Sequence, residues 1–328
     1  MIESPETLSG EAGRGFGAAP WLGRIVCGDN AEVLSGFPDA CIDLVVTSPP
    51  YDDLRTYGGH SWNFEALAAQ LVRVLKPGGV IVWVVADKID NGRTLTSMRQ
   101  AIHFKDVCRL NVWDTMIWDK PWCQYGDTAS RYAGTWEYMH ILSKGRPKTI
   151  NLIRDRSNAS AGSTRRIRTD RRVTKDTGGS VTRNKPHVTA TEGPRKAIWE
   201  YHVGSAQART EQGGDVRHPA IFPEALAKDH IASWSNPGDV VLDPFSGSGT
   251  TCKAAKELNR QWCGIEINPE YCKIAEARLS QDVLQLETCA MRPNVMIDDA
   301  TGKFEADARA FFEFCLDLYQ RLPTSTSP

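Results

Sequence analysis

The clearest signal along the chain is the alternation of short apolar runs with amphipathic stretches. The run IDLVVT at Ile42–Thr47 is almost continuously apolar, as in a strand buried on both faces of a parallel sheet. Residues 64–75 repeat apolar positions with helical spacing, and Lys76-Pro77-Gly78-Gly79 is expected to end that helix. The same pattern predicts strands at 24–27, 42–47, 80–85, 112–118, 136–142, 239–242 and 262–265, and helices at 31–34, 64–75, 98–109, 222–234, 250–258, 269–286 and 304–322.

Two helix starts carry local signals. Asn30 is the expected N-cap of the short helix at 31–34, and Pro223 stands in the first turn of the helix at 222–234. Strands alternate with helices on both sides of residues 145–195. This arrangement predicts an α/β fold, with a mostly parallel sheet covered by helices on both faces. Such sheets bind ligands outside the carboxyl ends of their strands.

Composition excludes several classes of protein. The 328 residues suit about two domains, or one α/β domain with a large insertion, and 41% are apolar and 24% charged. No apolar run approaches the length of a membrane span, and the N-terminus carries early acids without an apolar core, so we expect a cytoplasmic protein. None of the nine cysteines forms a C-x-x-C pair, which predicts reduced thiols and no metal site.

The net charge of −1 hides a strong asymmetry. From Lys144 to Lys196 there are 15 Lys and Arg residues against 4 Asp and Glu residues, whereas the rest of the chain has a net charge of −12. Residues 145–195 are also rich in Ser, Thr, Asn and Gly and lack a sustained apolar period. They predict a loop-rich basic insertion that binds a polyanion and becomes ordered on it.

The first strand-end motif is DPFSGSGTT at 243–251. Gly247 and Gly249 permit a tight turn and a close approach of the backbone to a ligand, but Cys252 breaks the G-x-G-x-x-G pattern of dinucleotide sites. The leading Asp243 favours a cationic ligand over a pyrophosphate. Glu266 ends the next strand and could accept hydrogen bonds from both ribose hydroxyls. A nucleoside with a cationic tail, such as S-adenosylmethionine, fits these features; the alternative is an ordinary strand–turn–helix corner.

The second motif is Ser48-Pro49-Pro50-Tyr51, which follows the apolar strand at 42–47. Consecutive prolines fix the backbone and lack N–H groups, so they leave a row of carbonyl acceptors. Together with a hydroxyl and an aromatic ring, these acceptors suit a planar ring that bears an amino group.

As a pair, the two motifs resemble the S-adenosylmethionine-dependent DNA methyltransferases that modify N4 of cytosine or N6 of adenine. The resemblance covers roughly residues 22–146 and 215–282. The catalytic motif precedes the basic insertion and the cofactor loop follows it, an order that in this family defines the circularly permuted β class. The implied fold is a Rossmann-like methyltransferase domain with the target-recognition region inserted between its halves.

The resemblance divides the chain into five parts. They are a disordered lead-in at 1–21, a catalytic half at 22–144, a basic target-recognition insertion at 145–197, a cofactor-binding half at 198–286 and a C-terminal helical extension at 287–328. It implies duplex DNA as partner, in a bacterial or phage-encoded protein. The sequence leaves open whether the chain forms a homodimer and whether a restriction endonuclease acts on the same site.

Site residues follow from the same resemblance. The implied catalytic residues are Ser48, Pro49, Pro50 and Tyr51. The implied cofactor-binding residues are Asp29, His218, Pro219, Phe222, Asp243, Phe245, Gly247, Gly249, Thr250 and Glu266. The implied DNA-binding residues are Arg165, Arg166, Arg168, Arg171 and Arg172.

Several further positions keep two interpretations. His218 either packs beside the methionine end of the cofactor or caps the following helix. Glu137 either belongs to a segment, Trp136-Glu137-Tyr138, that resembles one of the family or is a structural acid paired with an arginine. Lys120 resembles a separate W-x-K element of the family. We expect Trp113, Trp118 and Trp136 in the core, whereas Trp122 and Tyr125 are candidates for stacking on a base.

The implied chemistry is direct methyl transfer. An exocyclic amine is a poor nucleophile, so Ser48 and the Pro49 carbonyl would polarise it, and orientation would supply most of the rate. The base must be flipped out of the duplex, with Tyr51 stacking on it. Ser48, where many adenine enzymes carry Asp, favours N4 of cytosine, with N6 of adenine as the alternative. A DNA-binding protein on an inactive methyltransferase scaffold and a nicotinamide oxidoreductase are more distant alternatives.

Overall fold

The computed structural model describes residues 19–50, 62–89, 91–121, 130–166, 186–202 and 223–280. The chain divides into two compact units, 1–282 and 283–328, and all described residues belong to the first. Residues 1–18 of the expected lead-in, the helix at 304–322 and the C-terminal extension therefore lie outside the described residues. The lead-in prediction of 1–21 is wrong at its end, because Trp21 stacks on Phe37. No described helix is both long and apolar enough to cross a membrane.

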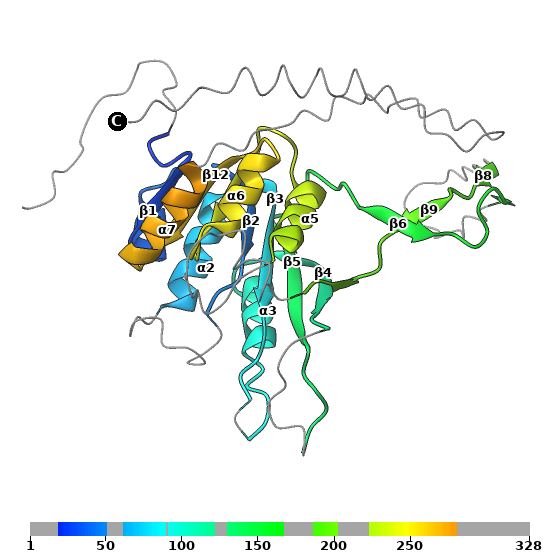
Figure 1. Ribbon diagram of the computed structural model, residues 1–328, viewed down its shortest axis with the longest axis horizontal. Coiled ribbons are helices and arrows are strands. Elements are labelled where there is room, and N and C mark those ends of the chain that lie inside the picture. The colour runs from blue at the N-terminus through cyan, green and yellow to red at the C-terminus, as the bar shows by residue number, and fades with distance from the viewer. Residues whose placement is uncertain are drawn as a thin grey trace, which may run out of the picture. The chain divides into compact units, whose positions relative to one another are not determined.

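The centre of the first unit is an eight-stranded sheet in the order β1-β12-β11-β2-β3-β5-β4-β10 (Figure 1). All neighbouring strands pair in parallel except β5, which is antiparallel to both β3 and β4. This confirms the predicted mostly parallel sheet. The strands are β1 (Arg24–Cys27), β2 (Ile42–Thr47), β3 (Leu75–Val85), β4 (Asn111–Asp119), β5 (Trp136–Ser143), β10 (Ile198–Glu200), β11 (Val240–Asp243) and β12 (Gln261–Glu266).

Helices cover both faces of this sheet. Val45 belongs to a core shared with α1, α2 and α3, whereas its neighbour Val46 belongs to a core shared with α5 and α6, as the two-residue period of a strand requires. A third, smaller cluster packs α7 against β1. The helices are α1 (Asn30–Ser35), α2 (Phe64–Val74), α3 (Thr96–Asp106), α5 (Glu224–Trp234), α6 (Thr250–Glu257) and α7 (Pro269–Ser280).

Two local predictions are wrong. The N-cap of α1 is Asp29, whose Oδ1 accepts hydrogen bonds from the backbone N–H groups of Ala31 (2.9 Å) and Glu32 (3.0 Å), while Asn30 is the first helical residue. The end of the helix predicted at 64–75 is confirmed to within one residue, because α2 ends at Val74, but the role of Lys-Pro-Gly-Gly at 76–79 as its stop is wrong, because β3 begins at Leu75 and runs through these residues. A residue before proline disfavours helical backbone, which explains the early end of the helix.

The basic insertion contains regular structure that its sequence did not predict. β6 (Arg154–Ser157) pairs antiparallel with β9 (Glu192–Pro194), and β7 (Thr164–Arg166) pairs antiparallel with β8 (Pro186–Val188). The prediction of a loop-rich segment is therefore wrong for these residues. Strands of three or four residues, polar on both sides, leave no apolar alternation to detect.

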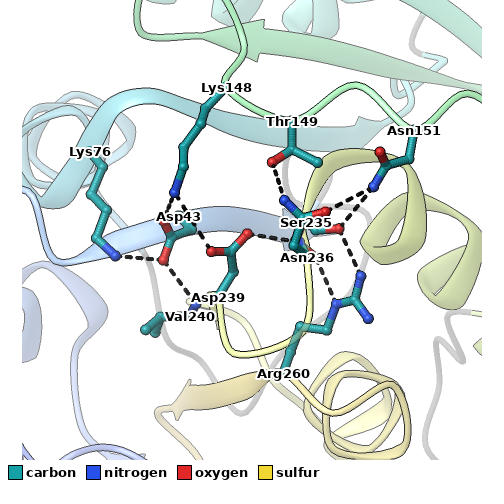
Figure 2. A network of polar contacts seen from close by, with 10 residues as sticks. All are labelled: Asp43, Lys76, Lys148, Thr149, Asn151, Ser235, Asn236, Asp239, Val240 and Arg260. Carbon is teal, nitrogen blue, oxygen red and sulfur yellow. Dashed lines mark hydrogen bonds and ion pairs between the residues drawn. The ribbon is translucent and has the colours of Figure 1, made fainter.

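A polar network joins the starts of β2 and β11 (Figure 2). The buried Asp43 accepts hydrogen bonds through Oδ2 from Lys76 Nζ (2.6 Å) and from the backbone N–H of Val240 (3.0 Å). Lys148 Nζ lies 4.0 Å from Asp43 Oδ1 and 3.9 Å from Asp239 Oδ1. The network thus ties the start of the basic insertion to the central sheet.

The same network continues to the turn after α5 (Figure 2). Asn236 Nδ2 donates to Thr149 Oγ1 (3.0 Å), and Asn151 Nδ2 donates to the carbonyl of Ser235 (3.4 Å). Arg260 donates through Nη2 to that carbonyl (2.7 Å) and through Nε to Ser235 Oγ (3.0 Å). These contacts therefore fix residues 148–151, at the start of the basic insertion, against the sheet and the turn after α5.

Replacing Asp43 by alanine is expected to lower the free energy of unfolding by about 1–3 kcal/mol, because the buried Val240 N–H loses its acceptor. Urea denaturation measures the change. Asp39→Ala is the matched control, since its carboxylate is 77% exposed and its pair with Arg73 contributes little, about 0–1 kcal/mol. Equal loss in both variants would contradict a structural role for the buried network.

Candidate active site

The two motifs meet where β2 and β11 end side by side. Thr47, the last residue of β2, donates a hydrogen bond from Oγ1 to Oδ1 of Asp243, the last residue of β11, at 2.7 Å. Ser48 follows directly, with Pro49 buried and Pro50 half-buried beside it. Segments almost 200 residues apart are thereby brought to one edge of the sheet. Tyr51 lies outside the described residues.

The glycine-rich loop between β11 and α6 depends on left-handed backbone. Gly247 has φ 51° and Gly249 has φ 80°, and Gly249 caps the N-terminus of α6, which starts at the buried Thr250. Arg278 of α7 holds this loop, because its Nη1 donates to the Ser248 carbonyl (2.6 Å) and to Ser248 Oγ (2.9 Å). Arg278 was not predicted as a site residue, because no motif in its own segment indicates a contact with the glycine-rich loop.

Glu266 ends β12 and shapes the same loop. Its Oε2 accepts a hydrogen bond from the backbone N–H of Gly247 (2.8 Å), and its Oε1 accepts one from the N–H of Asn268 (2.9 Å). A carboxylate offers about four acceptor positions, so two remain for other donors. The geometry places an acid with spare acceptor capacity beside the turn of the glycine-rich loop.

Asp243 is buried and sits at the junction of both motifs. Burial raises the pKa of its carboxyl group from 3.8 to about 6, and the charge of Glu266 adds to the rise. Hydrogen bonds from Thr47, the Phe245 N–H and Thr251 oppose it. The group therefore changes charge close to neutral pH, where a bound cation would favour its ionised form.

The loop after β1 adds two contacts. Asp29 uses its carboxylate to cap α1 and follows Gly28, whose N–H donates to the Glu266 carbonyl (2.9 Å). The buried Asn30 donates from Nδ2 to the Pro244 carbonyl (3.2 Å), so α1 is fastened to the loop of the first motif. The sequence suggested Asn30 only as a cap. A buried amide without local partners is recognisable only after folding.

Aromatic rings close the side of the loop nearest α2. Phe245 packs edge-on against Trp62, with ring centroids 5.0 Å apart at 78°. The ring centroid of Trp62 in turn lies 6.3 Å from that of Trp83 in β3. Phe245 is half-buried, which fits a residue that lines a site and contacts the core at once. His218, Pro219 and Phe222 lie outside the described residues.

A buried ion pair lies at the same sheet edge, where β4 ends and the antiparallel β5 begins. Lys120 Nζ donates to Glu137 Oε1, and the ammonium group also lies 4.9 Å from the centre of the Trp118 ring. Glu137 is therefore paired with a lysine, and both interpretations of its role stay predictions.

The three tryptophans placed in the core differ from one another. Trp118 is buried as expected, but Trp113 is 42% exposed, so its prediction is wrong. Trp113 falls between Val112 and Asp114, where a bulge shifts the pairing of β4 with β5. Trp136 is half-buried, and the guanidinium of Arg93 lies 4.6 Å from its ring centre. The remaining candidates, Trp122 and Tyr125, lie outside the described residues.

Asp87 is a further polar residue at this edge, two positions past β3. Its Oδ1 accepts hydrogen bonds from the N–H (3.0 Å) and the Oγ (2.7 Å) of Ser97. Its Oδ2 is buried and has no hydrogen-bond partner among the described residues. Because β3 pairs directly with β2, Asp87 and Ser48 follow neighbouring strands at the same edge of the sheet. No motif in the sequence marks Asp87.

The predicted DNA-binding arginines are only partly described. Arg165 and Arg166 lie in β7, which pairs with β8. Arg168, Arg171 and Arg172 lie outside the described residues. Their role therefore stays a prediction.

Comparison with known proteins adds independent findings. The family model for N6/N4 DNA methylases matches residues 42–277. The chain is 48% identical over 247 residues to the orphan methyltransferase M.BamHII of Bacillus amyloliquefaciens, covering 75% of this chain and 91% of that protein. It is 27% identical over 297 residues to the type II methyltransferase M.SmaI of Serratia marcescens, covering 78% and 90%.

Solved structures show the same fold. The cytosine-N4-specific PvuII DNA methyltransferase matches with a TM-score of 0.57 at 22% identity, over 80% of this chain and 89% of that one. The complex of M1.HpyAVI with S-adenosylmethionine matches with a TM-score of 0.52 at 22% identity, over 78% and 98%. Both matches cover more than three quarters of this chain, so the shared fold extends well beyond the two short motifs.

Proposed function

The chain belongs to the N6/N4 DNA methylase family, in its β class, and from this premise we propose that it methylates the exocyclic N4 of cytosine in duplex DNA. The observation that carries the proposal is the hydrogen bond between Thr47 and Asp243. It joins the strand before Ser48–Tyr51, here called the amine-binding motif, to the glycine-rich loop. The choice of cytosine is supported by Ser48 and by the cytosine-N4 specificity of the PvuII enzyme.

The methyl donor of this family is S-adenosylmethionine, and the described residues fit it. Glu266 has acceptor capacity for the two ribose hydroxyls, and the left-handed turn at Gly247 holds the loop backbone beside that carboxylate. Gly249 lets the loop pack closely against Ala275 of α7. Asp243 offers a buried negative charge to a cationic ligand. When bound, S-adenosylmethionine supplies an activated methyl group on its sulfonium. We assign Asp29, Phe245 and Thr250 to the wall of the same pocket.

The other residues act on the target base. Ser48 and the Pro49 carbonyl accept hydrogen bonds from the amino group and raise electron density on its nitrogen, while Tyr51 stacks on the ring. We propose Asp87, which follows the neighbouring strand β3 and has one buried oxygen without a described partner, as an acceptor for the proton that the amine releases. The target lies inside a duplex, so the base must be flipped to reach this edge.

Cofactor binding is expected to strengthen as the pH rises through about 6, the pKa of Asp243. A cation binds better to the ionised carboxylate, so affinity should fall by up to ~10-fold per pH unit below this value. The sign for stability is opposite. The native state binds the proton of Asp243 more tightly than the unfolded chain does. The free energy of unfolding therefore decreases as the pH rises from 3.8 to about 6. Calorimetry from pH 5 to 7.5 measures the affinity.

Asp243→Asn is the variant that checks the assignment, since it removes the titrating group and should flatten the affinity profile. Asp39→Asn removes an exposed carboxylate elsewhere and should leave the profile unchanged. A profile that keeps its slope in Asp243→Asn would assign the titration to another group.

Nucleoside analysis tests the proposed function itself. DNA from a methylation-free bacterial host that expresses the protein is hydrolysed and examined by mass spectrometry, with a host that expresses Ser48→Ala as control. We expect N4-methylcytosine that is absent from the control. N6-methyladenine alone would overturn the base assignment, whereas no methylated base would support the inactive scaffold.

A further inference from the structure

The described part of the basic insertion forms a two-stranded ribbon, here called the arm and defined as residues 152–166 and 186–196. Backbone hydrogen bonds link the β6–β9 pair to the β7–β8 pair. The N–H of Asn158 donates to the Thr191 carbonyl (2.9 Å), and the N–H of Thr189 donates to the Ser163 carbonyl (3.0 Å). The two short ladders therefore belong to one antiparallel ribbon.

One end of the arm is fastened to α5 by Arg195. Its Nη1 donates to Asp229 Oδ2 (2.6 Å) and to the Tyr201 hydroxyl (3.0 Å), and its guanidinium lies 5.2 Å from the centre of the Trp199 ring. Its Nε donates to Asp155 Oδ2 (2.5 Å) on the other strand of the arm. One arginine thus holds both strands of the arm against the methyltransferase domain.

A β-bulge separates the charges of the arm. Arg154 pairs with Pro194 and Arg156 pairs with Gly193, so Asp155 is the extra residue of β6. Bulges turn side chains in new directions, and here the turned residue is the acid that meets Arg195. Asp155 is the only acid of β6, and its charge is neutralised by Arg195. It is therefore not the ion-pair partner of Arg154 or Arg156.

Arg154 and Arg156 are therefore exposed cations on the ribbon. Neither forms an ion pair with any residue that the structure describes, although Asp155 stands between them. Arg156 lies across the ribbon: its Nε donates to the Pro194 carbonyl (3.2 Å), and its Nη2 would be 2.5 Å from a Cβ at position 193. Gly193 thus makes room for a guanidinium held flat on the surface of the arm.

We infer that the arm enters the major groove of the target DNA as a β-ribbon, with Arg154 and Arg156 binding phosphates at the rim of that groove. The inference rests on the proposed function and adds a docking mode to it. In undistorted B-DNA the major groove, about 12 Å wide, admits a two-stranded ribbon, whereas the minor groove, about 6 Å wide, takes one only when the duplex is bent or widened. Arginines held at the base of the arm lie where the ribbon crosses the phosphate backbone.

The first test compares salt dependence. The double variant R154A/R156A is titrated with a random-sequence duplex of about 30 base pairs at several salt concentrations. The slope of log affinity against log salt should fall by roughly two units, one for each phosphate that the variant no longer binds. R99A/K105A removes two exposed cations from α3 and is the matched control. A slope equal to that of the control would overturn the inference.

The second test identifies the groove. Dimethyl sulfate modifies guanine N7 in the major groove and adenine N3 in the minor groove. Interference with binding is expected at guanine N7. Interference confined to adenine N3 would place the arm in the wrong groove and overturn the inference.

The two failures are distinguishable. If the wild type methylates DNA and R154A/R156A keeps the wild-type salt slope, only the inference about the arm is overturned. A wild-type protein that binds duplex with the expected slope but transfers no methyl group contradicts only the proposed function. Unchanged melting temperature and cofactor affinity in the double variant are required of the proposed arm, since neither arginine contacts the rest of the domain in the described structure.

Discussion

Replacing Ser48 by alanine is expected to lower kcat by roughly 100-fold or more while leaving the affinity for S-adenosylhomocysteine unchanged. The hydroxyl lies at the end of β2 in the amine-binding motif, one residue beyond the contact between Thr47 and Asp243. It is proposed to meet the target base and not the methyl donor. An interaction that strengthens as charge develops on the amine affects the rate far more than ground-state binding. Single-turnover methyl transfer and calorimetry measure the two effects separately.

Ser35→Ala is the matched control, because that hydroxyl is exposed and bonds only its own helix, to the Glu32 carbonyl. Its kcat should stay within error of the wild type. Tyr51→Ala should resemble Ser48→Ala, since stacking on a base is worth about 1–3 kcal/mol. If Ser48→Ala weakened cofactor binding as much as it slowed transfer, the residue would belong to the cofactor pocket and the proposed division of the site would be wrong.

The central strands were predictable because parallel strands are buried on both faces. β2 is buried at every position, and its sequence IDLVVT shows this directly. The same property indicates where a ligand can bind: because both faces of such a strand are covered, side chains that meet a ligand lie at its end. The sequence therefore places Ser48 and Asp243 at strand ends, and the structure adds that those strands are neighbours.

Other features could not be predicted, because they depend on contacts rather than on local pattern. The edge strand β10 pairs with β4 over only three residues, and Trp199 is the one residue of β10 that is buried. β6 is exposed at all four positions, so no periodicity marks it. Lys76 lies in β3 and donates to Asp43 of β2, a partner 33 residues earlier that no local pattern indicates.

The candidate site shows the same division. The glycines and acids of the loop were found because their chemistry is visible in the sequence. Arg278, which fixes the Ser248 carbonyl, and Asn30, which fixes the Pro244 carbonyl, were not. Each supports a loop far away in the chain, and an arginine or an asparagine on a helix carries no mark of such a partner. Residues that orient the site are thus harder to predict than residues that contact its ligands.

Glu266 orients the loop and is also proposed to contact the ligand, which makes its replacement informative. Glu266→Ala is expected to weaken S-adenosylhomocysteine binding by about 1–3 kcal/mol, because the variant cannot form the hydrogen bonds proposed to both ribose hydroxyls in a pocket that is partly shielded from water. The same change releases the Gly247 and Asn268 N–H groups from their acceptor, so the loop itself also loosens. Glu270→Ala is the matched control, since that carboxylate is on the first turn of α7 and its side chain is 72% exposed.

Glu266→Gln separates the two contributions. A glutamine keeps one oxygen acceptor and can hold one loop N–H, yet it cannot accept from two hydroxyls and the loop at once. Calorimetry with S-adenosylhomocysteine and with a ribose-modified analogue that lacks the 2′-hydroxyl compares them. If the ribose contact dominates, the analogue should bind the wild type more weakly than S-adenosylhomocysteine does. Its affinity for the two variants should then be little lower than its affinity for the wild type. If the analogue and the natural ligand lose equal affinity on mutation, Glu266 acts only by shaping the loop, and the assignment of the ribose to this carboxylate fails.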